Sequence, residues 1–229
     1  MKDGINHVFF DLDDTLWDFE TNSDQVLMQL FREFDLEKKL NSSFTDFIGV
    51  YKEINSQLWR KYSLKEISKE ELRNNRFEFT FQKFEYSNYN ENLALTHQYL
   101  SRAPHGKVLK DGCLDILEFL SKKYQLHIIT NGFKEIQDIK LNGSGLKPYF
   151  KNIIISEEHN LSKPDPEIFK LAEKLAVANA DECIMIGDNK ENDVHGALIS
   201  GWKAIHYHPA KHPDVPHQIA HLLELKELL

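Results

Sequence analysis

Short apolar runs, several rich in Ile or Val, recur along the chain between polar or turn-forming residues. Such runs are typical of buried β-strands. The predicted strands are His7–Phe10, Leu126–Thr130, Ile153–Ile155, Cys183–Ile186 and Lys203–His206.

Segments with helical spacing lie between the later strands. They are Phe133–Leu141, then Pro166–Ala176 with Asp165 as N-cap, and Lys190–Ile199. Strands that alternate with helices indicate a parallel sheet covered on both faces. We therefore predict an α/β fold, a three-layer, Rossmann-like parallel sheet.

A long stretch without a convincing strand separates the first strand from the rest. It contains four helical patterns, Gln25–Phe34, Phe44–Lys61, Lys69–Phe84 and Glu91–Ser101. We predict a core of residues 1–17 and 105–229 and an all-helical domain over residues 18–104. Because the insertion leaves at the end of the first strand, we expect it to cover the site there and carry specificity groups.

The composition argues against several classes of protein. The 229 residues have a formal charge of −8, which argues against a nucleic-acid-binding surface. Two cysteines, Cys113 and Cys183, give no disulfide framework and favour a reducing compartment. No signal peptide or membrane-spanning segment can be drawn, so we expect a cytoplasmic protein.

Two carboxylates, Asp11 and Asp13, follow the first strand, with Thr15 shortly after. Residues two apart on an extended segment share a face, so these carboxylates can converge on one small volume. Like charges held together need a cation or a shared proton, and a Mg²⁺ that also holds a substrate phosphate supplies the cation. A carboxylate beside it can attack phosphorus.

Three further clusters follow later strands. Thr130-Asn131-Gly132 offers a hydroxyl and backbone amides to a phosphate, although alone it is more typical of a turn. Lys163 lies on a loop stiffened by Pro164 and Pro166, where it can neutralise phosphate.

The fourth strand ends in Gly187-Asp188, and Asp193 follows five residues later. Asp193 is also explicable as an ordinary helix-capping residue. Asp188 is harder to explain structurally, because an uncompensated charge after an apolar strand is costly.

These motifs, in this order and with a helical insertion after the first, resemble the haloacid dehalogenase-like (HAD) hydrolase superfamily over essentially the whole chain. The resemblance implies a HAD core with a C1-type cap. Together with Asn142-Gly143-Ser144-Gly145-Leu146 and Ser162–Phe169, the motifs look most like the pyrimidine 5′-nucleotidase (YjjG-type) branch.

The resemblance implies a role for each motif residue. Asp11 would be the nucleophile and Asp13 the general acid and base. Mg²⁺ would be held by Asp11, the backbone carbonyl of Asp13 and Asp188, with Asp193 orienting the metal shell. Thr130 and the amide of Asn131 would bind phosphoryl oxygens, and Lys163 would balance charge. The family's strand order would place the first and fourth strands side by side, where open α/β sheets bind ligands.

We therefore expect a Mg²⁺-dependent phosphomonoester hydrolase that forms an aspartyl-phosphate. Its partner would be a small phosphorylated metabolite, with a pyrimidine nucleoside 5′-monophosphate as first candidate. We expect no nucleic-acid polymer and no membrane, and a monomer or homodimer. The alternatives are a sugar-phosphate phosphatase, a phosphomutase, a dehalogenase in which Asp11 attacks carbon, and an idle fold that binds a ligand or partner.

Overall fold

The computed structural model describes residues 2–210 and 212–229. These residues form two compact units. One unit combines Met1–Phe19 with Lys107–Leu229, and the other is Glu20–Gly106.

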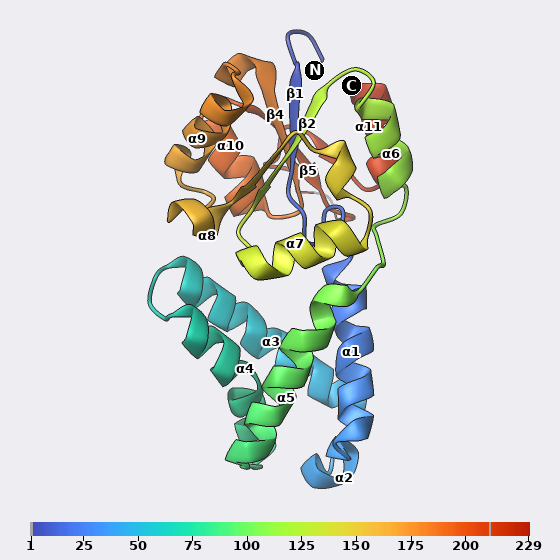
Figure 1. The fold of residues 1–229 in the computed structure, drawn as a ribbon, viewed down its shortest axis with the longest axis vertical. Helices are drawn as coiled ribbons and strands as arrows, with labels where there is room; N and C mark the ends of the chain where they lie inside the picture. The colour runs from blue at the N-terminus through green and yellow to red at the C-terminus, as the bar shows by residue number, and fades with distance from the viewer. Residues whose placement is uncertain (1, 211) are drawn as a thin grey trace. The chain divides into compact units, whose positions relative to one another are not determined.

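A six-stranded parallel sheet runs through the described part of the first unit (Figure 1). Its strand order is β3-β2-β1-β4-β5-β6. The strands are β1 His7–Phe10, β2 Gln125–Thr130, β3 Asn152–Ile155, β4 Cys183–Gly187, β5 Lys203–Tyr207 and β6 Gln218–Ile219. The predicted fold class and the adjacency of the first and fourth strands are confirmed. The two-residue β6 was not predicted.

Helices cover both faces of the sheet, as Figure 1 shows. Val8 and Phe10 of β1 belong to one core cluster with α6 and α11, whereas Phe9 belongs to the other with α9 and α10. This alternation follows from the two-residue period of a strand. The helices of this unit are α6 Cys113–Leu120, α7 Lys134–Gly143, α8 Ser156–His159, α9 Pro166–Ala176, α10 Gly196–Ile199 and α11 Leu225–Leu228, with 3-10 turns at Lys147–Tyr149, Ala180–Glu182 and Leu222–Glu224.

One predicted helix has an unexpected form. Lys190–Ile199 was predicted as one helix, but Lys190–His195 is a π-helix that passes into α10. The Asn189 carbonyl accepts hydrogen bonds from the backbone N–H groups of both Asp193 and Val194. A widened turn of this kind is frequent at functional sites.

The second unit is helical, with the four longer helices that the spacing predicts. They are α1 Phe19–Glu33, α3 Phe44–Ser63, α4 Lys69–Lys83 and α5 Tyr89–Arg102; the short α2 Leu36–Leu40 was not predicted, and a 3-10 turn follows at Ala103–His105. Ser68 begins α4 with a capping box to Glu71. Phe77 and Phe81 lie in the hydrophobic core of this unit. Among the described helices, none is long and apolar enough to span a bilayer.

Two buried histidines join β1 to β2. His127 is fully buried and its ring stacks on Phe9, with centroids 4.4 Å apart. Its Nδ1 lies 3.0 Å from the Asn152 side-chain nitrogen, which can only donate, so Nε2 carries the hydrogen and donates to His7 Nδ1 at 3.2 Å. Burial, with the neighbouring His7 and Lys151 adding to it, lowers the pKa of His127 to about 3. Both rings are therefore paired in their neutral form.

This pair makes stability depend on pH. The unfolded chain protonates His127 near pH 6.5 while the folded chain resists protonation, so the free energy of unfolding falls as pH drops below about 6.5. Between pH 7 and pH 5 the loss from His127 is about 2 kcal/mol. We expect His127→Gln to remove this part of the pH dependence in urea unfolding, whereas the exposed His159→Gln should not. If the free energy of unfolding depends equally on pH in the wild type and in His127→Gln, this role of His127 is contradicted.

Candidate active site

The site forms where β1, β2 and β4 end at one edge of the sheet. Phe10 is in register with Ile128 of β2 and with Ile186 of β4. The Asp11 backbone N–H donates to the Ile186 carbonyl at 2.9 Å. This bond extends the pairing of β1 with β4 by one residue beyond Phe10. It therefore fixes the position of the Asp11 backbone, from which the side chain enters the site.

A buried lysine connects two of the predicted acids. Lys163 Nζ donates to Asp11 Oδ1 and Asp193 Oδ1, both at 2.6 Å, and to the Ile129 carbonyl at 2.8 Å. All three ammonium donors are therefore used. Burial alone would lower the pKa of Lys163, but the charges of Asp11 and Asp193 outweigh it and raise that pKa. Lys163 is thus a permanent cation in the site.

Asn131 holds the lysine loop in place. Its side-chain oxygen accepts from the Lys163 backbone N–H at 3.0 Å, and its side-chain nitrogen donates to the Lys163 carbonyl at 2.9 Å. Ser156 Oγ lies 2.6 Å from the same Asn131 oxygen. The side chain of Asn131 therefore has a structural function that the sequence did not indicate.

Asp188 is anchored from two directions. Thr15 Oγ1 donates to Asp188 Oδ1 at 3.1 Å and accepts from the Asp188 N–H at 3.0 Å. His206 Nε2 lies 2.8 Å from the Asp188 carbonyl, to which it can only donate. Burial, with the charges of Asp193 and Asp14, raises the pKa of Asp188 to about 7. Burial and the neighbouring negative charges therefore disfavour the ionised form of Asp188 unless a cation lies beside it.

Asp193 reaches the site from the π-helix. It is 1% exposed, and its Oδ2 accepts from the Asn189 N–H at 3.0 Å. A Cβ at Gly187 would lie 2.1 Å from that same Oδ2. Only glycine fits at position 187 with Asp193 so placed, which gives the Gly-Asp motif a steric reason.

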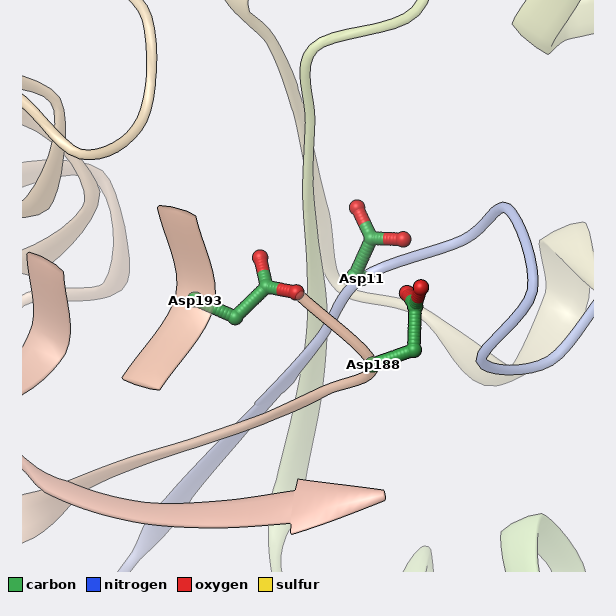
Figure 2. A group of neighbouring side chains, drawn as sticks. All are labelled: Asp11, Asp188 and Asp193. Atoms are coloured by element: carbon green, nitrogen blue, oxygen red, sulfur yellow. The ribbon is translucent and has the colours of Figure 1, made fainter. Parts of the chain in front are cut away.

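Figure 2 shows Asp11 at the end of β1 close to Asp188 and Asp193, which both come from the segment that follows β4. One carboxylate oxygen from each lies within 4.8 Å of the others. Burial, opposed by Lys163, raises the pKa of Asp11 well above its usual value, and the charges of Asp193 and Asp188 add to the rise. An octahedral Mg²⁺ with oxygen ligands at about 2.1 Å fits between oxygens of this spacing. The donor set is therefore suited to a hard divalent cation.

Asp13 lies outside this trio. Its Oδ1 accepts from Lys140 Nζ at 2.6 Å and its Oδ2 from Gln137 Nε2 at 2.9 Å. Neither α7 residue was singled out in the sequence, because polar residues on a predicted helix are usually solvated. With Asp13 and Lys140 included, four carboxylates face two lysines.

Thr130 presents a free hydrogen to the site. Its Oγ1 accepts from the Gly132 N–H at 3.2 Å and from Gln137 Nε2 at 2.7 Å, which occupies both lone pairs. The hydroxyl hydrogen has no acceptor among the described residues and can be donated to an anion. The arrangement can therefore bind a phosphoryl group beside a carboxylate nucleophile and a metal.

Several known proteins are similar to this chain in sequence. A family model for haloacid dehalogenase-like hydrolases matches residues 5–201. The pyrimidine 5′-nucleotidase PynA of Streptococcus pneumoniae is 35% identical over 204 residues, which are 88% of this chain and 83% of PynA. The pyrimidine 5′-nucleotidase YjjG of Escherichia coli is 28% identical over 230 residues, which are 97% and 96% of the two chains.

A solved structure agrees over the full length. The crystal structure of the HAD-hydrolase YfnB from Bacillus subtilis bound to magnesium superposes with a TM-score of 0.88. The two chains are 29% identical, and the match covers 98% of each. The motifs, the fold and these relatives agree: the chain belongs to the haloacid dehalogenase-like hydrolase family, and it resembles the branch that includes YjjG and PynA.

Proposed function

We propose that this protein is a Mg²⁺-dependent phosphatase that hydrolyses phosphomonoesters through a phosphorylated Asp11. The observation that carries the proposal is the buried Asp11 carboxylate. It is held by Lys163 at 2.6 Å, close to Asp188 and Asp193, with the free Thr130 hydrogen at the end of the neighbouring strand. The phosphatase relatives PynA and YjjG support it.

The chain's own residues account for each step. Asp11 attacks phosphorus in line, and the bond from phosphorus to the ester oxygen breaks as Asp13 protonates that oxygen. Asp13 then takes a proton from the water that attacks the phosphorylated carboxylate, which releases inorganic phosphate and restores Asp11. The Thr130 hydroxyl and the backbone N–H of Asn131 hold the phosphoryl oxygens, and Lys163 balances their charge.

The metal would be held by Asp11, Asp188 and the backbone carbonyl of Asp13, with Asp193 orienting its shell. When bound, Mg²⁺ offsets the repulsion between the carboxylates and a phosphate dianion and polarises the phosphoryl oxygens. The magnesium in the YfnB structure supports this assignment.

We also assign the helical unit Glu20–Gly106 as the cap domain in which substrate discrimination resides, and a pyrimidine nucleoside 5′-monophosphate as the substrate. The activities named for PynA and YjjG support this substrate class. A cytoplasmic location and a monomeric or homodimeric state stay predictions from the sequence.

Dehalogenation by the same fold is the alternative chemistry. There Asp11 would attack carbon, and a departing halide needs neither a proton from Asp13 nor a metal carboxylate such as Asp188. The anchoring of both acids therefore favours phosphate ester hydrolysis.

Removing the nucleophile should abolish turnover and spare the fold. We expect Asp11→Asn to lower kcat by at least about 10³-fold, since the covalent route is lost. Phosphate release from p-nitrophenyl phosphate with Mg²⁺ measures this, and thermal melting checks folding. The half-exposed α7 residue Asp138, changed to Asn, is the matched control. Normal activity in Asp11→Asn would falsify the assignment.

Removing a metal carboxylate should weaken Mg²⁺ binding. We expect Asp188→Asn to raise the Kd for Mg²⁺ at least about tenfold in isothermal titration, because the site loses one charged ligand. The exposed acid Asp181, changed to Asn, should leave Kd unchanged. If Asp188→Asn binds as well as wild type, the ion lies elsewhere. If the wild type binds no Mg²⁺ at millimolar concentration, the idle fold is favoured.

A substrate panel tests the nucleotide assignment. With Mg²⁺ present, we expect kcat/KM for dUMP, UMP or TMP to exceed that for sugar phosphates by at least about tenfold, a difference of about 1.4 kcal/mol. Higher values for sugar phosphates would indicate a sugar-phosphate phosphatase. Transfer of the trapped phosphoryl group to a sugar phosphate instead of water would indicate a mutase.

A further inference from the structure

The carboxylate of Asp13 accepts hydrogen bonds from two residues of one helix. Lys140 Nζ donates to its Oδ1 at 2.6 Å and Gln137 Nε2 to its Oδ2 at 2.9 Å. The two donors are three residues apart on α7, so they share one face of the helix. Both carboxylate oxygens are thereby fixed, and the plane of the Asp13 carboxyl group is set by α7.

Neither donor is an ordinary surface residue. Gln137 is fully buried, Lys140 is 4% exposed, and the Asp13 side chain keeps 28% of its exposure. Lys140 Nζ also lies 4.4 Å from the centroid of the Trp17 ring. Burying a lysine and an amide costs free energy unless each finds a hydrogen-bonding or charged partner. The partner that they share is Asp13.

The nitrogen of the Gln137 amide faces Asp13, and this orientation leaves the amide oxygen without a hydrogen bond. Its Oε1 is buried and finds no hydrogen-bond partner among the described residues. Reversing the amide would place that oxygen against the Asp13 carboxylate, where two acceptors repel. A buried acceptor without a partner is unusual. Here it is explained by the nitrogen of the same amide, which donates one hydrogen to Asp13 and the other to Thr130.

The second of those hydrogens goes to Thr130. Gln137 Nε2 donates to Thr130 Oγ1 at 2.7 Å, so one amide group joins the acid–base carboxylate to the phosphate-binding hydroxyl. A Cβ at position 132 would lie 2.1 Å from Gln137 Nε2. Gly132 is therefore required for this close approach, which explains the Thr-Asn-Gly sequence better than a turn preference does.

We propose that Gln137 and Lys140 are positioning residues that aim the Asp13 carboxyl group at the ester oxygen, so that α7 sets how well poor leaving groups are expelled. The inference rests on the proposed function, because it requires that Asp13 protonates the leaving oxygen. Proton transfer depends on placement within hydrogen-bond reach, and an error of about 1 Å can cost about 10²-fold in rate.

Esters that differ in leaving group test this role. Nitrophenolate leaves without a proton, whereas the alkoxide of dUMP or glycerol 2-phosphate needs one. We expect Lys140→Met to lower kcat/KM for the alkyl ester about 30-fold to 100-fold, and for p-nitrophenyl phosphate less than about 5-fold. Gln137→Met also removes a hydrogen bond to Thr130, so it should lower kcat/KM for both esters, with the larger loss for the alkyl ester. The value of kcat/KM covers the steps up to release of the alcohol, so later hydrolysis does not obscure the comparison.

Two reference variants make the outcome decisive. Asp13→Asn should show the same selectivity between esters, and Lys147→Met, which changes a half-exposed lysine paired with Asp138, should show none. Equal losses for both esters in the α7 variants, with Asp13→Asn still selective, would overturn the positioning role alone. Failure of the wild type to hydrolyse either ester would instead overturn the proposed function. Thermal melting of each variant separates misfolding from misplacement.

Discussion

The buried ion triad of Lys163, Asp11 and Asp193 is the interaction on which the rest of the site depends. Lys163 is 2% exposed, and its contacts with both carboxylates are 2.6 Å. At this burial, loss of one partner leaves an uncompensated charge, which costs about 3–5 kcal/mol. Because the three residues come from different segments, the triad also holds β1, the lysine loop and the π-helix in a single arrangement.

Small features of the backbone make that triad fit. Gly187 leaves the space that Asp193 Oδ2 occupies, and the π-helix carries Asp193 to the tip of β4. Asn131 binds both the N–H and the carbonyl of Lys163, so its amide replaces the partners that a strand would provide. Packing and hydrogen bonding, and not the charges alone, therefore decide where the ammonium group lies.

The sequence predicted the sheet well because its strands are buried on both faces and their apolar runs stand out between polar segments. It did not reveal β6 or α2, since two and five residues are too few for periodicity to register. Motif residues could be found because each follows a strand end. Gln137 and Lys140 could not, because their partner lies 124 and 127 residues away, and only the folded position of α7 shows that this face is buried.

The proposed mechanism gives different roles to Lys163 and to a divalent ion. Lys163 donates all three of its ammonium hydrogens within the protein, so its single positive charge offsets only part of the charge of a phosphate dianion. Two ionised carboxylates with oxygens within 4.8 Å of each other repel by at least about 3 kcal/mol at an effective dielectric of about 20. A phosphate would add to that repulsion. The fixed Lys163 cation therefore stabilises the fold, and the proposed divalent ion would offset the negative charge that Lys163 leaves uncompensated.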